Sequence, residues 1–348
     1  MIDLTQYATA SPLIHAVLCD PGTSWLGDSV AIDAPPDNDI DPSPAAQWPT
    51  DSVRTGLCGA VSPRVITLPG GGYRMYYTQI LPREGFAQGA NDYDNATARI
   101  LSATSSDGVA WTPERGVRLS AQAGGAGKFR VASSEVVPLD DGSERLRMYY
   151  ECCAGPQSQQ NSIRSAVSAD GLDWTVETGV RLELSDRNIT SPRIIFLDDG
   201  RCRLYCGERG RGIISAMSED GGLTFEVEPD LRVAADQSFD RFATFAPEII
   251  LLPSGGYRMF YAGYGDPKRA HILTAVSDDG LNWLKDSEPV LAPGSTTWDA
   301  VKCSEMCVIQ TPLSGAAGNS FRMFYEACDG TAQDQRGVWR IGSATCVG

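Results

Sequence analysis

The sequence predicts an all-β fold, a five-bladed β-propeller with four antiparallel strands in each blade. Three short phrases predict it, because they recur in the same order along most of the 348 residues. A strand-rich unit of this kind cannot bury both faces alone, so its copies must stack around an axis and close. We therefore expect a single propeller domain spanning residues 1–348.

The opening phrase of each unit is apolar almost throughout, as expected of an innermost strand that is packed on both faces. It reads SPRVITL, SSEVVPL, SPRIIFL, APEIILL and CSEMCVI, beginning at Ser62, Ser133, Ser191, Ala246 and Cys303. The next phrase, such as GGYRMYYT at Gly71–Thr78, alternates between its two faces and predicts the second strand.

A third strand then ends in the phrase Ser-x-Asp-Gly-x-x-Trp, which is followed by a short fourth strand such as GVRLS. The aspartate can accept hydrogen bonds from backbone N–H groups, and the glycine can take the positive φ that a tight turn demands. These turns lie at the end of the propeller opposite the expected pocket. We therefore predict a structural role, and no catalytic one, for Asp107, Asp170, Asp220 and Asp279.

The last unit stops after WRIGSATCVG and lacks a fourth strand. We expect Ser29–Ala34 to supply it, so that an N-terminal strand closes the last blade. Two segments, Ile14–Leu18 and Ile341–Cys346, compete for the third strand of that blade, and the sequence does not decide between them.

Two phrases resemble known families. The Ser-x-Asp-Gly-x-x-Trp phrase resembles the Asp-box of sialidases and other BNR-type propellers. The segment APEIILLPSGGYRMFYAG at Ala246–Gly263 resembles the innermost hairpin of five-bladed glycoside hydrolases: arabinanases, β-xylosidases, invertases, levansucrases and mannoside phosphorylases. The resemblance implies the fold and a carbohydrate-active enzyme.

The family's catalytic pattern transfers only in part. Glu248, in Ala-Pro-Glu, matches a family carboxylate that modulates the catalytic acid. Arg64 stands in the region of the family's first-blade aspartate, the general base, and the Glu-Gly-Pro phrase of the acid is absent. The resemblance therefore implies the fold more firmly than any catalytic residue.

The third position of the opening phrase is ionisable in every unit: Arg64, Glu135, Arg193, Glu248 and Glu305. Ionised groups that meet near an axis must pair with one another or meet a ligand, because burying them alone is costly. We predict that Glu135, Glu248 and Glu305 are catalytic and that Arg64 and Arg193 bind substrate; a purely structural Arg–Glu ring is the alternative. Further predicted substrate-binding residues are Glu151, Glu208, Glu326 and Tyr261, which lie on second strands farther from the axis, and Arg130, Arg241 and Asp299, which precede inner strands and can reach in.

Glycoside hydrolysis is the first functional hypothesis, since it needs two carboxyl groups that flank the scissile bond. The arginines allow an anionic sugar, or phosphate as the acceptor. Two other hypotheses stay open: a non-catalytic glycan-binding propeller, and a lyase or isomerase with a glutamate base and arginines that hold a carboxylate. No cofactor is expected. No metal site is expected either, because Cys303 and Cys307 alone do not make one.

Composition limits the partners. The formal net charge of −15 and pI of about 4.6 argue against nucleic acid and anionic membranes, which attract cationic surfaces. No apolar run suggests a membrane span or a secretory signal, so we expect a cytoplasmic protein whose ten cysteines are mostly buried thiols. The expected partner is a small molecule or an oligosaccharide, and nothing in the sequence predicts an oligomeric state.

Overall fold

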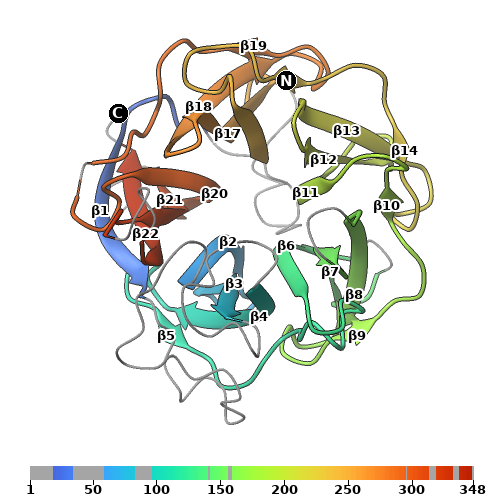
Figure 1. Cartoon of the computed structure of the whole chain (residues 1–348). Coiled ribbons are helices and arrows are strands. Elements are labelled where there is room, and N and C mark those ends of the chain that lie inside the picture. The colour runs from blue at the N-terminus through green and yellow to red at the C-terminus, as the bar shows by residue number, and fades with distance from the viewer. Residues whose placement is uncertain are drawn as a thin grey trace.

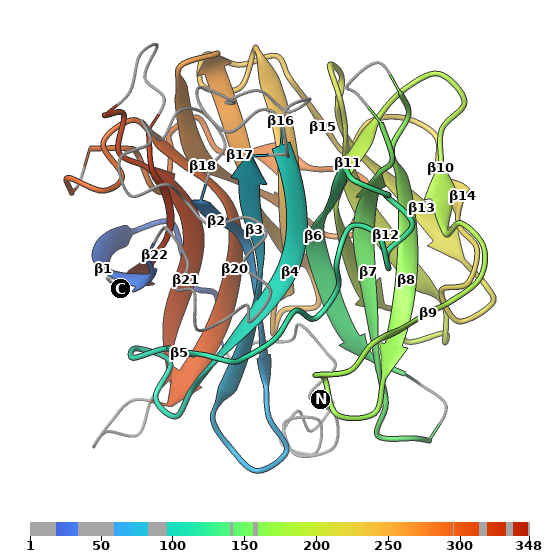
Figure 2. The same cartoon turned by 60° about the horizontal axis from the view of Figure 1, so that its bottom comes forward.

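The fold is all-β: in the described part of the chain the structure contains strands and no helix. It is a computed structural model that describes residues 19–33, 59–82, 96–139, 142–155, 159–294, 296–312, 319–331 and 337–346. Antiparallel groups of strands radiate from a central axis, which is the arrangement of a β-propeller (Figure 1). The long strands run between the two ends of the molecule (Figure 2).

We name each group after its first strand, which lies on the side of the central axis (Figure 1). The β2 group contains β2 (Gly59–Thr67), β3 (Tyr73–Pro82), β4 (Ala96–Ser105) and β5 (Thr112–Pro113). The β6 group contains β6 (Arg130–Pro138), β7 (Leu146–Cys153), β8 (Ser162–Ser168), β9 (Thr175–Val176) and β10 (Leu182–Glu183). In both groups consecutive long strands pair antiparallel, as the phrases predict.

The other groups repeat this plan. The β11 group contains β11 (Ile189–Phe196), β12 (Cys202–Glu208), β13 (Gly212–Ser218), β14 (Glu226–Val227) and β15 (Val233–Ala234). The β16 group contains β16 (Ala243–Leu251), β17 (Tyr257–Asp266), β18 (Arg269–Ser277) and β19 (Leu284–Lys285). The β20 group contains β20 (Lys302–Pro312), β21 (Asn319–Cys328), β22 (Trp339–Cys346) and β1 (Trp25–Ile32).

The predicted pairing of an N-terminal strand with the last group is confirmed. β1 runs antiparallel to β22, with Trp25 opposite Cys346 and Ile32 opposite Ile341. The strand begins four residues earlier than the predicted Ser29, because the side chain of Trp25 is buried and packs edge-on against Phe260 of the β16 group. β22 is the third strand of this group, and the competing segment Ile14–Leu18 lies outside the described residues.

The outer strand of a group is shorter than the sequence predicts. In the β6 group, β9 and β10 both pair with β8, and Gly179 lies between them with a φ of 91°. In the β11 group, β14 and β15 both pair with β13, with Asp230 at a φ of 66° between them. The chain therefore turns in the left-handed region and splits the fourth strand into two short pairings.

The first strands are bulged next to the axis. Left-handed φ values occur at Ser62 (55°), Ser133 (50°), Ser191 (54°) and Ala246 (52°). The ladder shifts register at each of them, for example between Val61 and Arg64 in β2. A bulge places two residues of one strand opposite one residue of the other and re-aims the side chains beside it. It therefore decides which side chains the first strands direct toward one another.

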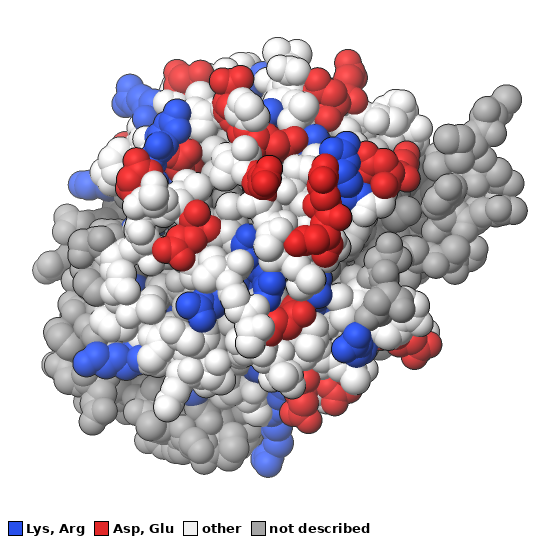
Figure 3. Space-filling model, turned by 90° about the vertical axis from the view of Figure 1, so that its right-hand side faces the viewer, with Lys and Arg blue, Asp and Glu red and all other residues white. Residues whose placement is uncertain are grey.

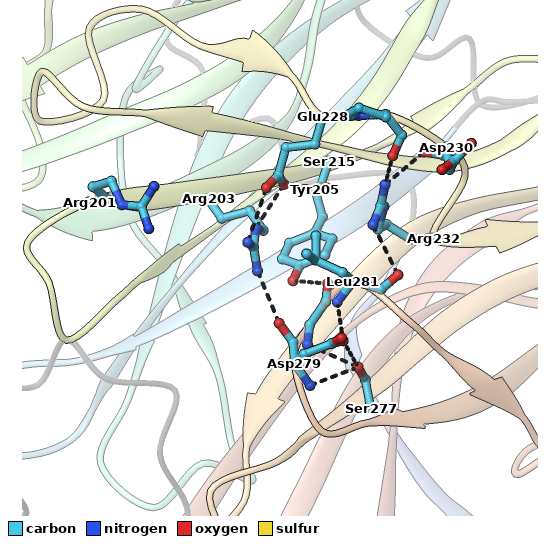
Figure 4. Close-up of polar contacts among 12 residues, drawn as sticks. Arg201, Arg203, Tyr205, Ser215, Glu228, Asp230, Arg232, Ser277, Asp279 and Leu281 are labelled. Carbon is cyan, nitrogen blue, oxygen red and sulfur yellow. Dashed lines mark hydrogen bonds and ion pairs between the residues drawn. The ribbon is translucent and has the colours of Figure 1, made fainter.

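Polar contacts join neighbouring groups at the end of the molecule opposite the one where the first strands begin. Arg203 of β12 forms a 2.8 Å ion pair with Glu228 and donates to the carbonyl of Asp279 in the next group (Figure 4). The Tyr205 hydroxyl donates to the carbonyl of Gly280. Arg74 with Glu114, and Arg147 with Glu177, repeat the arrangement around the molecule.

The predicted aspartate turns are confirmed. Asp279 accepts hydrogen bonds from the backbone N–H groups of Leu281 and Asn282, each 2.8 Å long, and from the Ser277 hydroxyl. Asp107 and Asp170 make the same pattern of contacts. These hydrogen bonds hold the pKa of Asp279 well below its ordinary value. The carboxylates are thus engaged in building the turns.

The surface that Figure 3 shows, on the side of β13 and β14, carries acidic and basic side chains intermixed. No helix in the described ranges is long and apolar enough to cross a membrane. Seven of the described cysteines are buried, as the sequence predicts: Cys152, Cys153, Cys202, Cys206, Cys303, Cys307 and Cys328.

Candidate functional site

Four ionisable side chains from four first strands meet near the axis. Arg64 of β2 pairs with Glu135 of β6 at 2.8 Å (Nε–Oε2) and with Glu248 of β16 at 3.1 Å (Nη1–Oε2). Arg193 of β11 lies 3.1 Å from the same Glu248 oxygen and 3.9 Å from Oε2 of Glu135. The predicted meeting of these four residues is therefore present in the structure, as an Arg–Glu ring.

The ring is closed to solvent and its members satisfy one another. All four residues are buried. Burial raises the pKa of Glu135 to about 7 against the attraction of Arg64 and Arg193. Burial lowers the pKa of Arg64, but Glu135 and Glu248 outweigh this effect and leave that pKa raised. Glu248 also accepts a 3.1 Å hydrogen bond from the Val308 N–H. The buried ion pairs of the ring therefore link the four first strands to one another.

Glu305 does not belong to this ring, although the sequence predicts that it occupies the same position as the four ring residues. Arg64 pairs with Tyr76 in its ladder, and the corresponding pair in the β20 group is Cys307 with Phe324. The Cys307 sulfur lies 3.8 Å from Nη1 of Arg64, at the ring itself. In β20 the register shifts between Ser304 and Met306, so Glu305 is the extra, bulged residue. It lies two residues before the ring position.

At that earlier position Glu305 meets the bulged serines of two other groups. Its Oε2 accepts hydrogen bonds from the hydroxyls of Ser62 (2.7 Å) and Ser133 (3.3 Å). Its Oε1 is buried and has no hydrogen-bond partner among the described residues. Burial is the largest influence on the Glu305 carboxyl and raises its pKa, and the charge of Glu151 adds to the shift. The group therefore holds its proton more tightly than an ordinary glutamate.

Two further carboxyl groups lie beside Glu305, and both come from ends of second strands. Glu326 of β21 accepts hydrogen bonds from the Ser304 hydroxyl (2.6 Å) and the Ser62 N–H (3.3 Å). Burial and the neighbouring Glu305 raise its pKa to about 8. Glu151 of β7 accepts a 2.7 Å hydrogen bond from the side-chain amide of Asn161. Two carboxyl groups with raised pKa values and a third nearby are suited to proton transfer.

Glu208, predicted in the same set, lies at the start of the β12–β13 turn. Its carboxylate is buried and pairs with Arg187 and Arg211. Asn188 links this corner to Glu151, because its side-chain oxygen accepts a 2.8 Å hydrogen bond from the N–H of Asn161. A continuous polar path therefore leads from the Arg187 corner to the carboxyl groups near the axis.

The structure places the other predicted binding residues in structural contacts. Arg130 donates to the carbonyls of Ala96 and Gly155, and the exposed Arg241 donates to the carbonyl of Gly265. The Tyr261 hydroxyl donates to Asp240, and the buried Asp299 accepts from the Tyr325 hydroxyl in the same manner. These residues hold loops against the strands. In these contacts they do not meet the carboxyl cluster, which consists of Glu305, Glu326 and Glu151.

Sequence reasoning missed Ser62, Ser133, Asn161 and Arg187. The serines carried a usable pattern, because four of the opening phrases start with the serine or alanine that lies in the bulge. Asn161 and Arg187 lie outside the repeated phrases, and nothing in the repeat points to them. They become part of the site only through the spatial neighbourhood of β7, β8, β11 and β12.

Solved structures share this fold. A glycosyl hydrolase from Bacteroides ovatus is 17% identical, with a TM-score of 0.64, 95% of this chain covered and 96% of that one. A thermostable family-43 glycoside hydrolase is 16% identical, with a TM-score of 0.61 and 82% and 91% covered. An N-acetylgalactosamine deacetylase from F. plautii, in complex with blood group B trisaccharide, is 17% identical, with a TM-score of 0.63 and 92% and 95% covered.

At these identities the likeness establishes the fold alone. No protein-family model matches the sequence, and no curated protein matches it. Function therefore has to be argued from the site.

Proposed function

We propose that the strand groups are the five blades of one closed propeller domain, and that the protein is a carbohydrate-active enzyme, most simply a glycoside hydrolase. The pairing of β1 with β22 supports closure of the ring. The similarity in fold to two glycoside hydrolases and a deacetylase found with a trisaccharide supports the class of activity.

Glu305 carries the proposal. One oxygen of its carboxyl group is held by two serine hydroxyls, and the other is buried without a hydrogen-bond partner in the described structure. A buried polar atom left unpaired is costly, and such atoms often mark functional positions. Burial raises the pKa of Glu305, so the group holds its proton to a higher pH than an ordinary glutamate does. Glu305 is thus suited to be the general acid.

In this reaction Glu305 gives its proton to the glycosidic oxygen while the bond between that oxygen and the anomeric carbon breaks. A water molecule adds to the anomeric carbon and loses a proton to a second carboxylate, so that hydrolysis consumes one water. Glu151 is proposed as that second group, because it lies on a different blade and its charge acts on Glu305. Glu326 then acts on the proton affinity of Glu305.

Glu135 and Glu248, predicted as catalytic from the sequence, receive a structural role in this proposal. Their carboxylates are buried against Arg64 and Arg193. The same pairing weakens the lyase or isomerase hypothesis, because that reaction needs these two arginines to hold a substrate carboxylate. A ring that is buried and mutually paired offers the substrate little.

The substitution Glu305→Gln tests the proposal, since it keeps the shape and removes the transferable proton. Activity is measured on a panel of aryl glycosides and oligosaccharides, each with and without inorganic phosphate. We expect turnover on at least one substrate to fall by roughly 100-fold or more. Glu114→Gln is the matched control, because Glu114 is a glutamate paired with Arg74 at the opposite end of the molecule.

Thermal unfolding of both variants separates loss of chemistry from loss of folding. A folded Glu305→Gln variant with undiminished turnover would exclude Glu305 as the acid. Glycan binding without turnover, unchanged in this variant, would instead support a non-catalytic glycan-binding propeller.

A further inference from the structure

A pair of arginines is held in place at the outer end of the polar path. The buried Glu208 is 4% exposed in its side chain, whereas Arg187 and Arg211 are 38% and 52% exposed. Arg187 Nη1 contacts Glu208 Oε1, and Arg211 Nη1 lies 3.3 Å from both Glu208 oxygens. The buried Glu208 carboxylate thus contacts two guanidinium groups that still reach solvent, and the exposed Asp186 lies 3.3 Å from Nε of Arg187.

The corresponding turn of the β16 group lacks this arrangement. There Asp266 is exposed and accepts hydrogen bonds from the backbone N–H groups of Lys268 and Arg269. Its carboxylate shapes the turn and does not orient a cationic side chain in those contacts. In the β11 group the acid is buried instead, and its contacts go to guanidinium groups.

The pair is positively charged within an acidic protein. Three arginines, Arg187, Arg209 and Arg211, stand against two acids, Asp186 and Glu208, in a chain of net charge −15. A guanidinium group presents several N–H donors in one plane and matches the two oxygens of a carboxylate. Because Glu208 already limits the motion of both side chains, less conformational entropy is lost when an anion binds.

The pair is also connected to the proposed catalytic group. The backbone N–H of Arg209 donates to the carbonyl of Asn188, and Asn188 accepts from Asn161. Asn161 in turn donates to Glu151, whose charge acts on Glu305. A sugar chain that reaches from Glu305 toward the β12–β13 turn would bring a neighbouring unit to the arginines.

We propose that Arg187 and Arg211 form a subsite for an acidic sugar unit, a uronic acid whose carboxylate pairs with both guanidinium groups. The inference rests on the proposed function, and it names the substrate class as an anionic oligosaccharide. Glu208 is the positioning residue of the subsite, since it acts through the arginines and not on the substrate.

Binding measured by calorimetry tests this subsite separately from catalysis. The probes are three matched oligosaccharides: one with a uronic acid unit, its methyl ester, and the neutral sugar of the same linkage. A panel of uronate linkages is screened first on the wild-type protein. We expect the free acid to bind about 10-fold or more tightly than the ester, with a preference that weakens as salt is raised.

The double variant Arg187→Gln/Arg211→Gln should lose that preference and bind acid and ester alike. Arg201→Gln is the control, because Arg201 is an exposed arginine paired with Asp199 in the β11–β12 turn. It should keep the wild-type preference. Equal binding of acid and ester by the wild-type protein would overturn the inference, as would a preference that survives in the double variant.

The outcomes also distinguish this inference from the proposed function. If the wild-type protein shows no turnover but has a uronate preference that the double variant loses, the subsite is supported and the enzymatic function is not. If turnover depends on Glu305 but acidic sugars are not preferred, the enzymatic function is supported and the subsite is not.

Discussion

The hydroxyl of Ser62 donates a 2.7 Å hydrogen bond to Oε2 of Glu305, which joins the first strands of two groups. The backbone N–H of the same serine donates to Glu326 at 3.3 Å. Ser62 can direct both donors toward carboxyl groups because its φ of 55° places it in the bulge of β2. The left-handed serine of this bulge is therefore part of the carboxyl cluster.

Removing this hydroxyl should change the pH dependence of activity. The Ser62 hydrogen bond lowers the pKa of Glu305 against the larger effect of burial, so Ser62→Ala should raise that pKa further. A general acid works only while protonated, so the alkaline limb of the profile of kcat/KM against pH should move to higher pH. Steady-state kinetics across pH 4 to 10, roughly the range of carboxyl and phenol titration, measure the shift.

Ser133→Ala is the matched comparison, because Ser133 donates to the same oxygen over a longer distance of 3.3 Å. It should move the limb in the same direction by less. An alkaline limb that stays in place in both variants would mean that Glu305 is not the group that titrates.

Glu326 should make the protein less stable as the pH rises. Its pKa is about 8 in the folded protein, against an ordinary value of 4.5, so the folded state binds the proton more tightly than the unfolded state. The stability that this proton provides is complete below pH 4.5 and is lost progressively as the pH rises to about 8. Glu326→Gln removes the titration, so its free energy of unfolding should fall less over this window.

Denaturant unfolding at a series of pH values measures this difference. Glu177→Gln serves as the control, because the pKa of Glu177 is lowered and its contribution has the opposite sign. Parallel pH profiles for the wild-type protein and Glu326→Gln would contradict the assignment.

The repeat carried enough information to predict the first two strands of each group, the third strand of every group but the last, and the meeting of Arg64, Glu135, Arg193 and Glu248 near the axis. Arg64 and Glu135 hold the same position of the repeated opening phrase, so the repeat alone places them together near the axis. Their pairing into a closed network could not be predicted, because it depends on distances between strands that are far apart in the sequence.

The position of Glu305 was misjudged for a definite physical reason. Placing a residue by its position in the phrase assumes that the ladder shifts at the same point in every first strand, and one extra residue shifts every later side chain to the other face. In β20 the extra residue is Glu305 itself, whereas in β2 the bulge precedes Arg64. Both strands contain similar apolar phrases, so only the backbone reveals the difference.

Breaking the Arg–Glu ring should destabilise the protein strongly. Arg64→Met keeps much of the side-chain volume but leaves Glu135 and Glu248 with one cation fewer in a buried position. Removing one partner of a buried ion pair costs about 3–5 kcal/mol. Urea unfolding should show that loss, with Arg201→Gln, at an exposed pair, changing stability by less than about 0.5 kcal/mol. A near-neutral Arg64→Met would show that the ring is not the structural tie inferred from its geometry.

Closure of the propeller is tested at β1, the strand that pairs with β22 of the β20 group. Trp25 of β1 is 7% exposed and contacts Phe260 of the preceding group edge-on, with ring centroids 5.8 Å apart. Trp25→Ala should leave a cavity between the two groups and cost about 3–5 kcal/mol of unfolding free energy. The adjacent Leu26 points outward and is 57% exposed, so Leu26→Ala should change the stability by less than about 0.5 kcal/mol.

If β1 closes the propeller, the two neighbouring substitutions must differ by several kcal/mol in thermal or urea unfolding, since both truncate a large side chain on one short strand. Equal and small effects would mean that the N-terminal strand is dispensable and that the propeller holds together without it.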